Sequence, residues 1–366
     1  MRPLRPPPGG VPGDFRECPL GDAPARPLGF FAAFHAHASV VYGGVVQRVR
    51  TAVVGAGAFG RNHLRLLSQS ARAELVAVVD ADPERARAAA AEFGCQALAH
   101  HDELAGKVDA ALVAAPTAAH VEIGAALLEA GIHVLVEKPI APDLASAQRL
   151  VDTARRANRL LQVGHLERFN PAVAALARVV RIPLFFEVHR LSVFTPRSLD
   201  VDVVLDLMIH DIDIVLWLAG AMPEEIRAAG ISILSPKVDI ANVRLAFPGG
   251  CIANLTASRV STERVRKLRL FQPSEYISLD YSRQEAVRFS VSGNRQIGFA
   301  PLEAVKDEPL RLEIEAFLDS VATGAPVRVT GEEATRALEV AATILAKIEE
   351  HSRVVAQTLR RVSGGS

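Results

Sequence analysis

The chain has 366 residues, of which 49% are hydrophobic, and its 41 basic and 41 acidic side chains leave no formal net charge. This length favours two domains, and the balanced charge argues against a protein that binds nucleic acid or a membrane surface through a basic excess. Cys18, Cys95 and Cys251 lie far apart, which indicates neither a disulfide framework nor a zinc ribbon and fits a cytoplasmic protein. No run approaches 18 charge-free apolar residues, so no membrane span is predicted.

Residues 1–48 are rich in proline, glycine and arginine, a composition that cannot build a packed element. We expect a disordered or dispensable N-terminal extension. The alternative is an export signal in the apolar run of residues 29–46. That run starts late and follows no twin-arginine pair, which disfavours the alternative.

Residues 50–67 read RTAVVGAGAFGRNHLRLL, which predicts a strand, a glycine turn and a helix. Gly55 permits the tight turn, Gly57 lets a pyrophosphate approach the backbone, and Gly60 allows the helix to pack closely on the strand. The pyrophosphate would bind the free N–H groups at the positive end of the helix. The segment therefore predicts a dinucleotide site.

A second predicted strand, residues 74–79, ends at Asp80, 20 positions after Gly60. A carboxylate at this place binds a ribose 2′-OH and repels a 2′-phosphate, so we expect NAD rather than NADP. The alternative is an ordinary βαβ unit in which Asp80 caps the next helix. Asp82, followed by Pro83, is the better candidate for that cap.

Strands and helices alternate as far as residue 158, which predicts an α/β domain with a parallel sheet. The expected strands continue with 108–115, 133–136 and 160–165, and the expected helices are 85–93, 120–129 and 144–157. Ligands bind beyond the carboxyl ends of such strands. The residues at these ends, which should surround one crevice, are Gly57, Asp80, Pro116, Thr117, Lys138 and His165.

The pattern changes after residue 169, where helices are expected at 172–180, 201–218, 310–322 and 332–350. Strand-like runs cover 184–194, 227–234, 240–247, 251–258, 264–271, 276–280 and 286–291, which suggests an antiparallel meander. The expected organisation is an extension (1–48), a Rossmann domain (49–168), an α+β domain with a large, mostly antiparallel open sheet (169–351) and a flexible tail (352–366). The open sheet predicts a homodimer or homotetramer.

Lys138 follows the fourth parallel strand and precedes Pro139, which restricts it to extended conformations. A partly desolvated lysine at such a strand end can bind a substrate oxygen and has a lowered pKa suited to proton transfer. The alternative is a solvated lysine paired with Glu137.

The helix expected over residues 201–218 is apolar on most sides but places Asp202, Asp206, His210 and Asp213 on one face. We expect Asp206 to contact His210, raise the pKa of the imidazole and orient it as a general base. The alternative is a buried His–Asp pair that only holds the domains together. Because His100, His101 and Asp102 are adjacent in a loop and give poor ligand geometry, we assign them to the surface and expect no metal site.

Residues 55–60, Pro116-Thr117 with His120, Glu137-Lys138-Pro139 and Asp206-x-x-x-His210 together resemble the glucose-fructose oxidoreductase and inositol dehydrogenase family (Gfo/Idh/MocA). The resemblance covers residues 49–351 and implies an NAD(P)-dependent dehydrogenase with Lys138 as catalytic lysine, His210 as acid/base and Asp206 as its companion. Many members carry asparagine where this chain has Thr117. The implied cofactor contacts are Gly55, Gly57, Ala58, Phe59, Gly60, Asp80, Pro116, Thr117, His120, Glu137 and Lys138.

Within the family, residues 164–171 and 206–213 look most like the bacterial UDP-N-acetylglucosamine 3-dehydrogenases, which form a 3-keto sugar nucleotide used in making lipid A. This resemblance implies a nucleotide-sugar substrate held by His165, Arg168, Asn170, Arg190, Arg197 and Arg259. Each arginine could instead be a surface charge. The rival functions are another sugar or cyclitol dehydrogenase, including an inositol type, and a non-catalytic NAD-binding sensor or regulator. The presence of both Lys138 and His210 disfavours the sensor.

Overall fold

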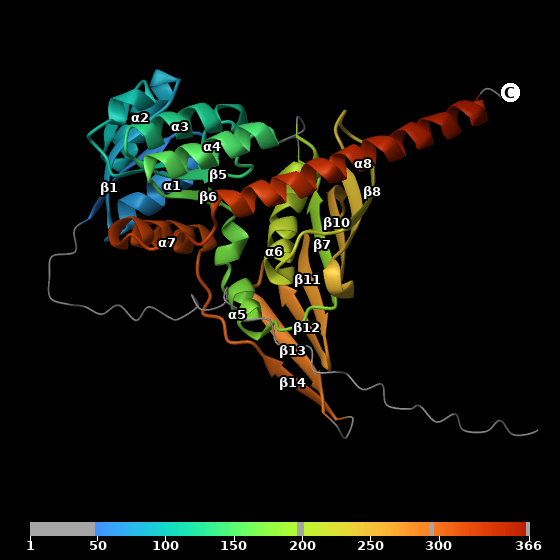
Figure 1. The fold of residues 1–366 in the computed structure, drawn as a ribbon. Coiled ribbons are helices and arrows are strands. Elements are labelled where there is room, and N and C mark those ends of the chain that lie inside the picture. The colour runs from blue at the N-terminus through green and yellow to red at the C-terminus, as the bar shows by residue number, and fades with distance from the viewer. Residues whose placement is uncertain (1–47, 196–200, 293–295, 364–366) are drawn as a thin grey trace, which may run out of the picture. The chain divides into compact units, whose positions relative to one another are not determined.

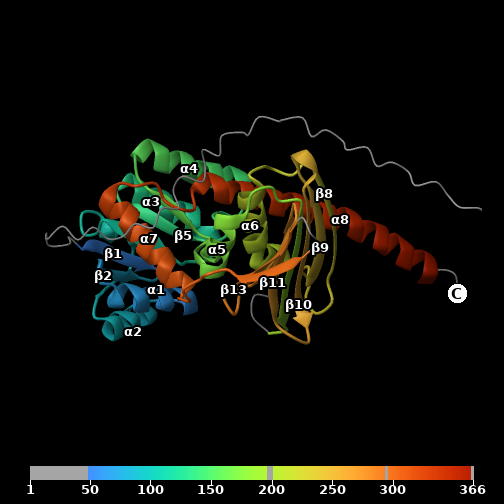
Figure 2. The same ribbon diagram turned by 90° about the horizontal axis from the view of Figure 1, so that it is seen from below.

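The computed structural model describes residues 48–195, 201–292 and 296–363. The extension expected over residues 1–48 therefore lies, apart from Arg48, outside the described residues. Figure 1 labels the elements along the chain, and Figure 2 shows them from below. In the ranges that the structure covers, no helix is both long enough and apolar enough to cross a bilayer.

Six parallel strands of the described chain form the first sheet, in the order β3-β2-β1-β4-β5-β6. Their bounds are Val49–Val54 (β1), Ala73–Val79 (β2), Gln96–Leu98 (β3), Ala110–Val113 (β4), His133–Glu137 (β5) and Leu161–Gly164 (β6). The strands β1, β4, β5 and β6 are almost completely buried and rich in Ala, Val and Leu, as is usual for a parallel sheet that is covered on both faces. This is the doubly wound arrangement expected for the first domain. The sequence did not reveal β3, because three residues carry no period.

Helices cover both faces of this sheet. On one face lie α1 (Ala58–Gln69) and α2 (Pro83–Phe93), and on the other lie α3 (His120–Glu129) and α4 (Leu144–Ala157). Asp82 caps α2 by accepting hydrogen bonds from two backbone N–H groups of its first turn, and Gly94 ends the helix in the left-handed conformation. The expected cap is confirmed.

Eight strands in the described residues form the second sheet, in the order β14-β13-β12-β11-β7-β10-β9-β8. Their bounds are Phe185–Val193 (β7), Glu225–Ile231 (β8), Ile240–Ala246 (β9), Ile252–Ser261 (β10), Val265–Gln272 (β11), Glu275–Asp280 (β12), Glu285–Val291 (β13) and Ile297–Pro301 (β14). The sheet is mostly antiparallel, as expected, but it is not a simple meander. β7 lies between β10 and β11 and pairs with β10 in parallel. The sequence did not predict this pairing, because the alternation of side chains along a strand indicates which face is buried and not which strand lies next to it.

One face of the second sheet is covered and the other is open. Its core joins inward side chains of the strands to α5 (Pro171–Val179), α6 (Ile209–Ala219) and residues 337–348 of α8 (Gly331–Ser363). Figure 1 shows α8 running alongside β8. On the opposite face, apolar side chains such as Phe299 (65%) and Ile297 (75%) are largely exposed.

The C-terminal helices connect the two sheets. Leu310, Ile314, Phe317 and Leu318 of α7 (Pro309–Thr323) pack in the core of the parallel sheet with α1, so the chain returns to the first domain after leaving it. The expected division, with every residue after 168 in the second domain, therefore does not hold for α7. The sequence could not show this, because the apolar face of a helix does not reveal which sheet it covers. The helix α8 continues to Ser363, so the tail expected over 352–366 is helical through Ser363. No glycine or proline interrupts it before Gly364.

Short helical turns complete the described elements. They are η1 (His101–Leu104), η2 (Thr117–Ala119), η3 (Leu166–Phe169), η4 (Val204–Met208) and η5 (Pro248–Gly250). Of these, η2 and η3 follow the carboxyl ends of β4 and β6, and η4 leads into α6. These three turns therefore lie on the segments that carry the candidate site.

Candidate active site

The glycine turn after β1 has the geometry that a dinucleotide site needs. Gly55 has φ +101°, and a Cβ there would lie 2.7 Å from the carbonyl oxygen of Ala114. A Cβ on Gly60 would overlap the carbonyl oxygen of Gly55. The turn and packing roles expected for these two glycines are confirmed.

Gly57 is different, because a Cβ there would meet no protein atom within 4 Å. It starts α1 without a capping side chain, and the first turn of α1, which includes Ala58 and Phe59, carries no acid. The uncapped N–H groups are suited to an anion such as a pyrophosphate. The residues present thus fit the expected dinucleotide, and contact with it stays a prediction.

Asp80 lies at the end of β2 as expected, but its carboxylate already holds the glycine turn. Its Oδ2 accepts from the Ala56 N–H at 2.7 Å, and its Oδ1 accepts from the Asp82 N–H at 2.9 Å. The Arg85 guanidinium lies 3.4 Å from Oδ1. These contacts position the turn, and a bond from Asp80 to a ribose stays a prediction.

The ends of β4 and β5 are joined by His120. Its Nε2 lies 2.8 Å from the carbonyl oxygen of Ala115, and its Nδ1 lies 2.9 Å from that of Pro139. Burial lowers the pKa of His120. This side chain therefore fixes the turns that carry Pro116, Thr117 and Lys138, while the cofactor contacts expected for His120, Pro116 and Thr117 stay predictions.

Lys138 reaches across to the second domain. Its Nζ donates to the backbone oxygen of Asp206 at 2.7 Å and lies 3.7 Å from the Asp206 carboxylate. Burial lowers the pKa of Lys138, against the charges of Asp206 and Glu137. The sequence left open a solvated lysine paired with Glu137. Instead, the Lys138 side chain is only 18% exposed, and Glu137 contacts His63 at 2.8 Å.

The segment of Asp206 is not an ordinary α-helix. Residues Val204–Met208 form a π-helical turn, in which the Ile209 N–H bonds to the Val204 carbonyl. Such turns are rare and occur frequently at functional sites. The π-helical turn changes the angle between successive side chains, so the four polar residues that a regular α-helix would place on one face contact different partners. Asp206 approaches Lys138, Asp213 binds Arg168, and Asp202 accepts from the Val238 N–H at 2.8 Å.

The expectation for the pKa of His210 was wrong. Burial, followed by the positive charges of Lys138 and Arg190, lowers this pKa well below its ordinary value. In the part of the chain that the structure describes, His210 Nδ1 has no hydrogen-bond partner, and Asp206 contacts Lys138 instead. His210 is therefore a neutral imidazole at pH 7, with a ring nitrogen that can accept a proton.

His165, at the end of β6, lies beside His210. The two rings are 6.2 Å apart in an edge-to-face arrangement. His165 is 1% exposed, and both of its ring nitrogens lack partners among the described residues. Buried polar atoms without partners are uncommon in folded proteins. The Lys138, His165 and His210 side chains thus provide unused hydrogen-bonding capacity where the two domains meet.

Arg168 and Arg190 are buried and bound to carboxylates of the protein. Arg168 donates to Asp213 at 2.7 and 2.9 Å, and Arg190 donates to Asp211 at 2.7 and 2.8 Å. Glu167 receives a further bond from Arg190 at 3.0 Å. These contacts exclude the surface position that the sequence left open for both arginines. Their role in substrate binding stays a prediction.

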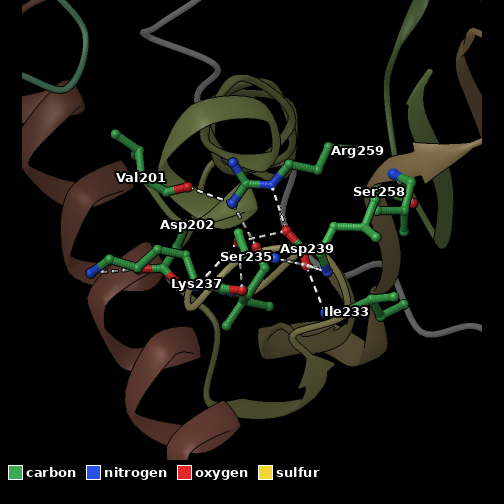
Figure 3. A network of polar contacts seen from close by, with 11 residues as sticks. Val201, Asp202, Ile233, Ser235, Lys237, Asp239, Ser258 and Arg259 are labelled. Atoms are coloured by element: carbon green, nitrogen blue, oxygen red, sulfur yellow. Dashed lines mark hydrogen bonds and ion pairs between the residues drawn. The ribbon is translucent and has the colours of Figure 1, made fainter. Parts of the chain in front are cut away.

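Asn170 and Arg259 also make internal contacts. Asn170 caps α5 and donates to the carbonyl oxygen of Tyr281 at 3.0 Å. Figure 3 shows Arg259 beside Asp239 and Val201. The Arg259 guanidinium lies 3.1 Å from the Asp239 carboxylate and donates to the carbonyl oxygens of Val201 and Val238. Three backbone N–H groups and the Ser235 hydroxyl donate to Asp239, and its pKa is lowered to about 2 despite burial. Arg197 lies outside the described residues.

Several residues of this region were not found from the sequence. Glu167, Asp211 and Tyr281 surround the Arg190 guanidinium, whose carbon lies 5.0 Å from the Tyr281 ring. His63, on α1, binds Glu137. Asp211, next to His210, could have been suspected. Tyr281 and His63 offered no signal, because their partners are distant in the sequence.

His100, His101 and Asp102 bring their ligand atoms within 4.8 Å of one another, and His100 Nδ1 lies 3.1 Å from Asp102. The trio follows the end of the edge strand β3, with His100 directly before the η1 turn and His101 and Asp102 on it. The surface position expected for these residues agrees with the exposure of His100 and Asp102. The expectation of no metal site stays a prediction.

Taken together, the parallel sheet with its uncapped helix and the buried Lys138, His165 and His210 side chains beyond its strands are the features of a dinucleotide-binding oxidoreductase. Residues 49–165 match the oxidoreductase family with an NAD-binding Rossmann fold, and residues 176–273 match the GFO/IDH/MocA C-terminal domain. The chain belongs to the Gfo/Idh/MocA family of oxidoreductases.

The chain is similar to two named dehydrogenases over most of its length. It is 35% identical to the UDP-N-acetylglucosamine 3-dehydrogenase of Acidithiobacillus ferrooxidans, over 82% of this chain and 97% of that protein. It is 28% identical to the myo-inositol 2-dehydrogenase of Thermotoga maritima, over 84% and 98%. A solved structure of the Acidithiobacillus enzyme matches with a TM-score of 0.79, at 35% identity, over 83% of this chain and 99% of that one.

Proposed function

We propose that this oxidoreductase catalyses the NAD-dependent oxidation of a secondary alcohol of a nucleotide sugar, UDP-N-acetylglucosamine to its 3-keto form. The observation that carries the proposal is the meeting of Lys138 with the segment that leads to the neutral, buried His210. The relative named for this reaction is similar over nearly its whole length, which supports the choice of substrate.

In the proposed mechanism, His210 accepts the proton of the substrate hydroxyl while Lys138 donates a hydrogen bond to the same oxygen. Loss of the proton leaves an alkoxide, whose electron pair forms the C=O bond as the carbon loses its hydride. NAD, when bound, supplies the hydride acceptor. Asp206 holds the Lys138 amine in place through its backbone oxygen. Asp206 is thus proposed as the companion of Lys138 and not of His210.

The preference for NAD over NADP belongs to the same proposal. A buried carboxylate, Asp80, lies where the ribose 2′-OH is expected, and a 2′-phosphate there would meet a like charge. Arg85 lies close enough to reduce this repulsion in part. We expect a lower KM for NAD than for NADP, measured with the same sugar, and an equal or lower KM for NADP would contradict the preference.

A second candidate is an inositol-type dehydrogenase, which the similarity to the Thermotoga enzyme favours. Purified protein incubated with NAD and a panel of UDP-sugars, free sugars and inositols, with NADH absorbance as readout, separates the two. We expect turnover with UDP-N-acetylglucosamine at a kcat/KM at least about 100-fold above that with free sugars, because a nucleotide contributes binding energy that a free sugar lacks. Turnover with myo-inositol alone would replace the first candidate with the second.

We also propose that the open face of the second sheet packs against a second copy of the chain in a homodimer or homotetramer. A row of contacting aromatic rings crosses strands of this sheet, formed by Phe185, Phe271, Tyr276, Phe289 and Phe299. Exposed apolar patches of this kind mark interaction surfaces. Light scattering after size exclusion should give a dimer or tetramer, and Phe299→Glu should shift it toward the monomer. A monomeric wild type would contradict the proposal.

A further inference from the structure

A buried polar cluster lies on the face of the parallel sheet that α1 and α7 cover. Its members, each no more than 8% exposed, are His63 on α1, Glu137 on β5, Gln162 on β6 and Glu313 on α7. In the register of β5 and β6, Gln162 lies beside Leu135, which is two residues from Glu137, so Gln162 and Glu137 point to the same side of the sheet. Residues from four elements therefore converge there.

Two contacts join members of the cluster in two separate pairs. His63 Nε2 lies 2.8 Å from Glu137 Oε1, and the Gln162 side-chain amide lies 3.4 Å from the backbone oxygen of Glu313. Gly164 provides the space for Glu137, because a Cβ at this position would lie 2.8 Å from Glu137 Oε2. The sequence thus accommodates this carboxylate with a glycine on the neighbouring strand.

Glu313 is the unusual member. It is completely buried, and among the described residues neither of its carboxyl oxygens has a hydrogen-bond partner and neither forms an ion pair with a lysine or arginine. An ionised carboxylate here would carry an uncompensated buried charge, which is strongly unfavourable. Burial and the charge of Glu137 both raise the pKa of Glu313 well above its ordinary value.

A protonated carboxylic acid differs from a carboxylate in having a donor. Gln162 Oε1 is a buried acceptor without a donor among the described residues. A proton on Glu313 therefore supplies a hydrogen-bond donor, which the cluster otherwise lacks for Gln162 Oε1. It also removes a second negative charge that would repel the Glu137 carboxylate. Glu137 is the residue directly before Lys138, so a displacement of Glu137 would move the lysine.

We propose that Glu313 is a positioning residue, held as a neutral carboxylic acid, which together with His63 keeps Glu137 in place and so keeps the Lys138 amine on Asp206. Glu313 itself touches neither Lys138 nor Asp206. Glu137 from β5 is the titratable group whose charge acts on Glu313, and Glu137 is in turn bound by His63 from α1 and followed in the chain by Lys138.

The protonation of Glu313 is tested by infrared difference spectroscopy on the full chain without substrate. We expect the carbonyl stretch of a protonated carboxylic acid at pH 7 in the wild type and its loss in Glu313→Gln. The control, Glu315→Gln, lies on the same helix with its carboxylate bound to Ser70 and Arg72, and should keep the band. A wild type with the same spectrum as Glu313→Gln would overturn the neutral acid.

The positioning is tested by the ¹³C signals of reductively dimethylated lysines, with the Lys138 signal assigned from its loss in Lys138→Arg. The chain has six lysines, few enough to resolve. Glu313→Gln, neutral and of the same shape, should leave the Lys138 signal and its titration unchanged. Glu313→Leu removes the donor and should shift both, with thermal unfolding confirming that the variant folds. An unshifted Lys138 signal in folded Glu313→Leu would overturn the positioning role.

The kinetic arm rests on the proposed function. Glu313→Leu should lower kcat about tenfold and leave the KM for NAD unchanged, whereas Glu313→Gln should stay within about threefold of wild type. Equal losses in both variants, or wild-type kcat in Glu313→Leu, would count against the positioning role. A wild type that oxidises no sugar would refute only the proposed function, since the infrared and lysine measurements need no substrate.

Discussion

Two groups of buried polar side chains meet near the candidate site, and they are organised in opposite ways. Arg168 and Arg190 each hold a carboxylate in a two-pronged ion pair, so their charges are compensated inside the protein. His165 and His210 are equally buried but have ring nitrogens without partners among the described residues. Compensated charges hold a structure together, whereas an unpartnered buried polar atom costs stability. The histidines are therefore the groups expected to meet a ligand.

The largest expected effect is a loss of turnover, and it distinguishes residues that take part in the proposed reaction from residues that support the fold. Lys138→Ala should lower kcat by about 10²–10⁴-fold, because the hydroxyl oxygen loses its cationic hydrogen-bond donor. NAD affinity should stay near wild type, since the glycine turn is untouched. Lys237→Ala, a lysine 4.0 Å from Asp202 in the second domain, is the control and should keep wild-type kcat. Full activity in Lys138→Ala would remove this lysine from the mechanism.

Substitutions in the buried arginine–carboxylate pairs should lower the free energy of unfolding. Arg190→Met leaves Asp211 and Glu167 buried without their cation, a change that costs about 3–5 kcal/mol in comparable cases. Denaturant unfolding monitored by the single tryptophan measures this loss. Arg155→Met, which breaks exposed pairs with Asp152 and Glu332, should cost no more than about 1 kcal/mol. Equal losses would show that the Arg190 network does not support the fold.

This contrast was visible in the sequence only in part. The alternation of strands and helices, the glycine turn and the strand-end lysine depend on local patterns, and the structure contains them where expected. The partners of the arginines could not be predicted, because Arg190 lies on β7 and Asp211 on α6, and no local period relates them. The His210 environment was missed because a π-helical turn replaces the regular helix on which the Asp206 contact depended.

The glycine turn also contains one residue that the fold requires, Gly55, and one that ligand binding is expected to require, Gly57. Gly55→Ala puts a side chain at φ +101° against the Ala114 carbonyl and should cost about 1–3 kcal/mol of stability. Gly57→Ala meets no protein atom within 4 Å, so stability should stay within about 1 kcal/mol of wild type. NAD affinity should nevertheless fall at least about tenfold, because the methyl group occupies the space expected for the pyrophosphate. Calorimetric titration with NAD and thermal unfolding measure the two effects, and unchanged affinity in Gly57→Ala would contradict the proposed binding site.

The smallest expected effect concerns the cost of an unpartnered histidine. The pKa of His210 is lowered in the folded chain, so below about pH 6.5 the unfolded chain binds a proton that the folded chain does not. Stability should therefore fall as the pH drops from about 6.5 toward the folded pKa, with a contribution from His210 of at most about 1.4 kcal/mol per pH unit. His210→Asn removes this contribution and should lose less stability than wild type between pH 7 and pH 5.

Urea unfolding at several pH values measures the difference, and Met208→Leu, a neutral change two residues away and also buried, should keep the wild-type slope. His165 lies beside His210 and also has a lowered pKa, so part of the acid sensitivity should persist in His210→Asn. An identical slope in His210→Asn and wild type would mean that His210 has a partner in solution. In that case the unpartnered nitrogen would no longer distinguish the histidines from the arginine network.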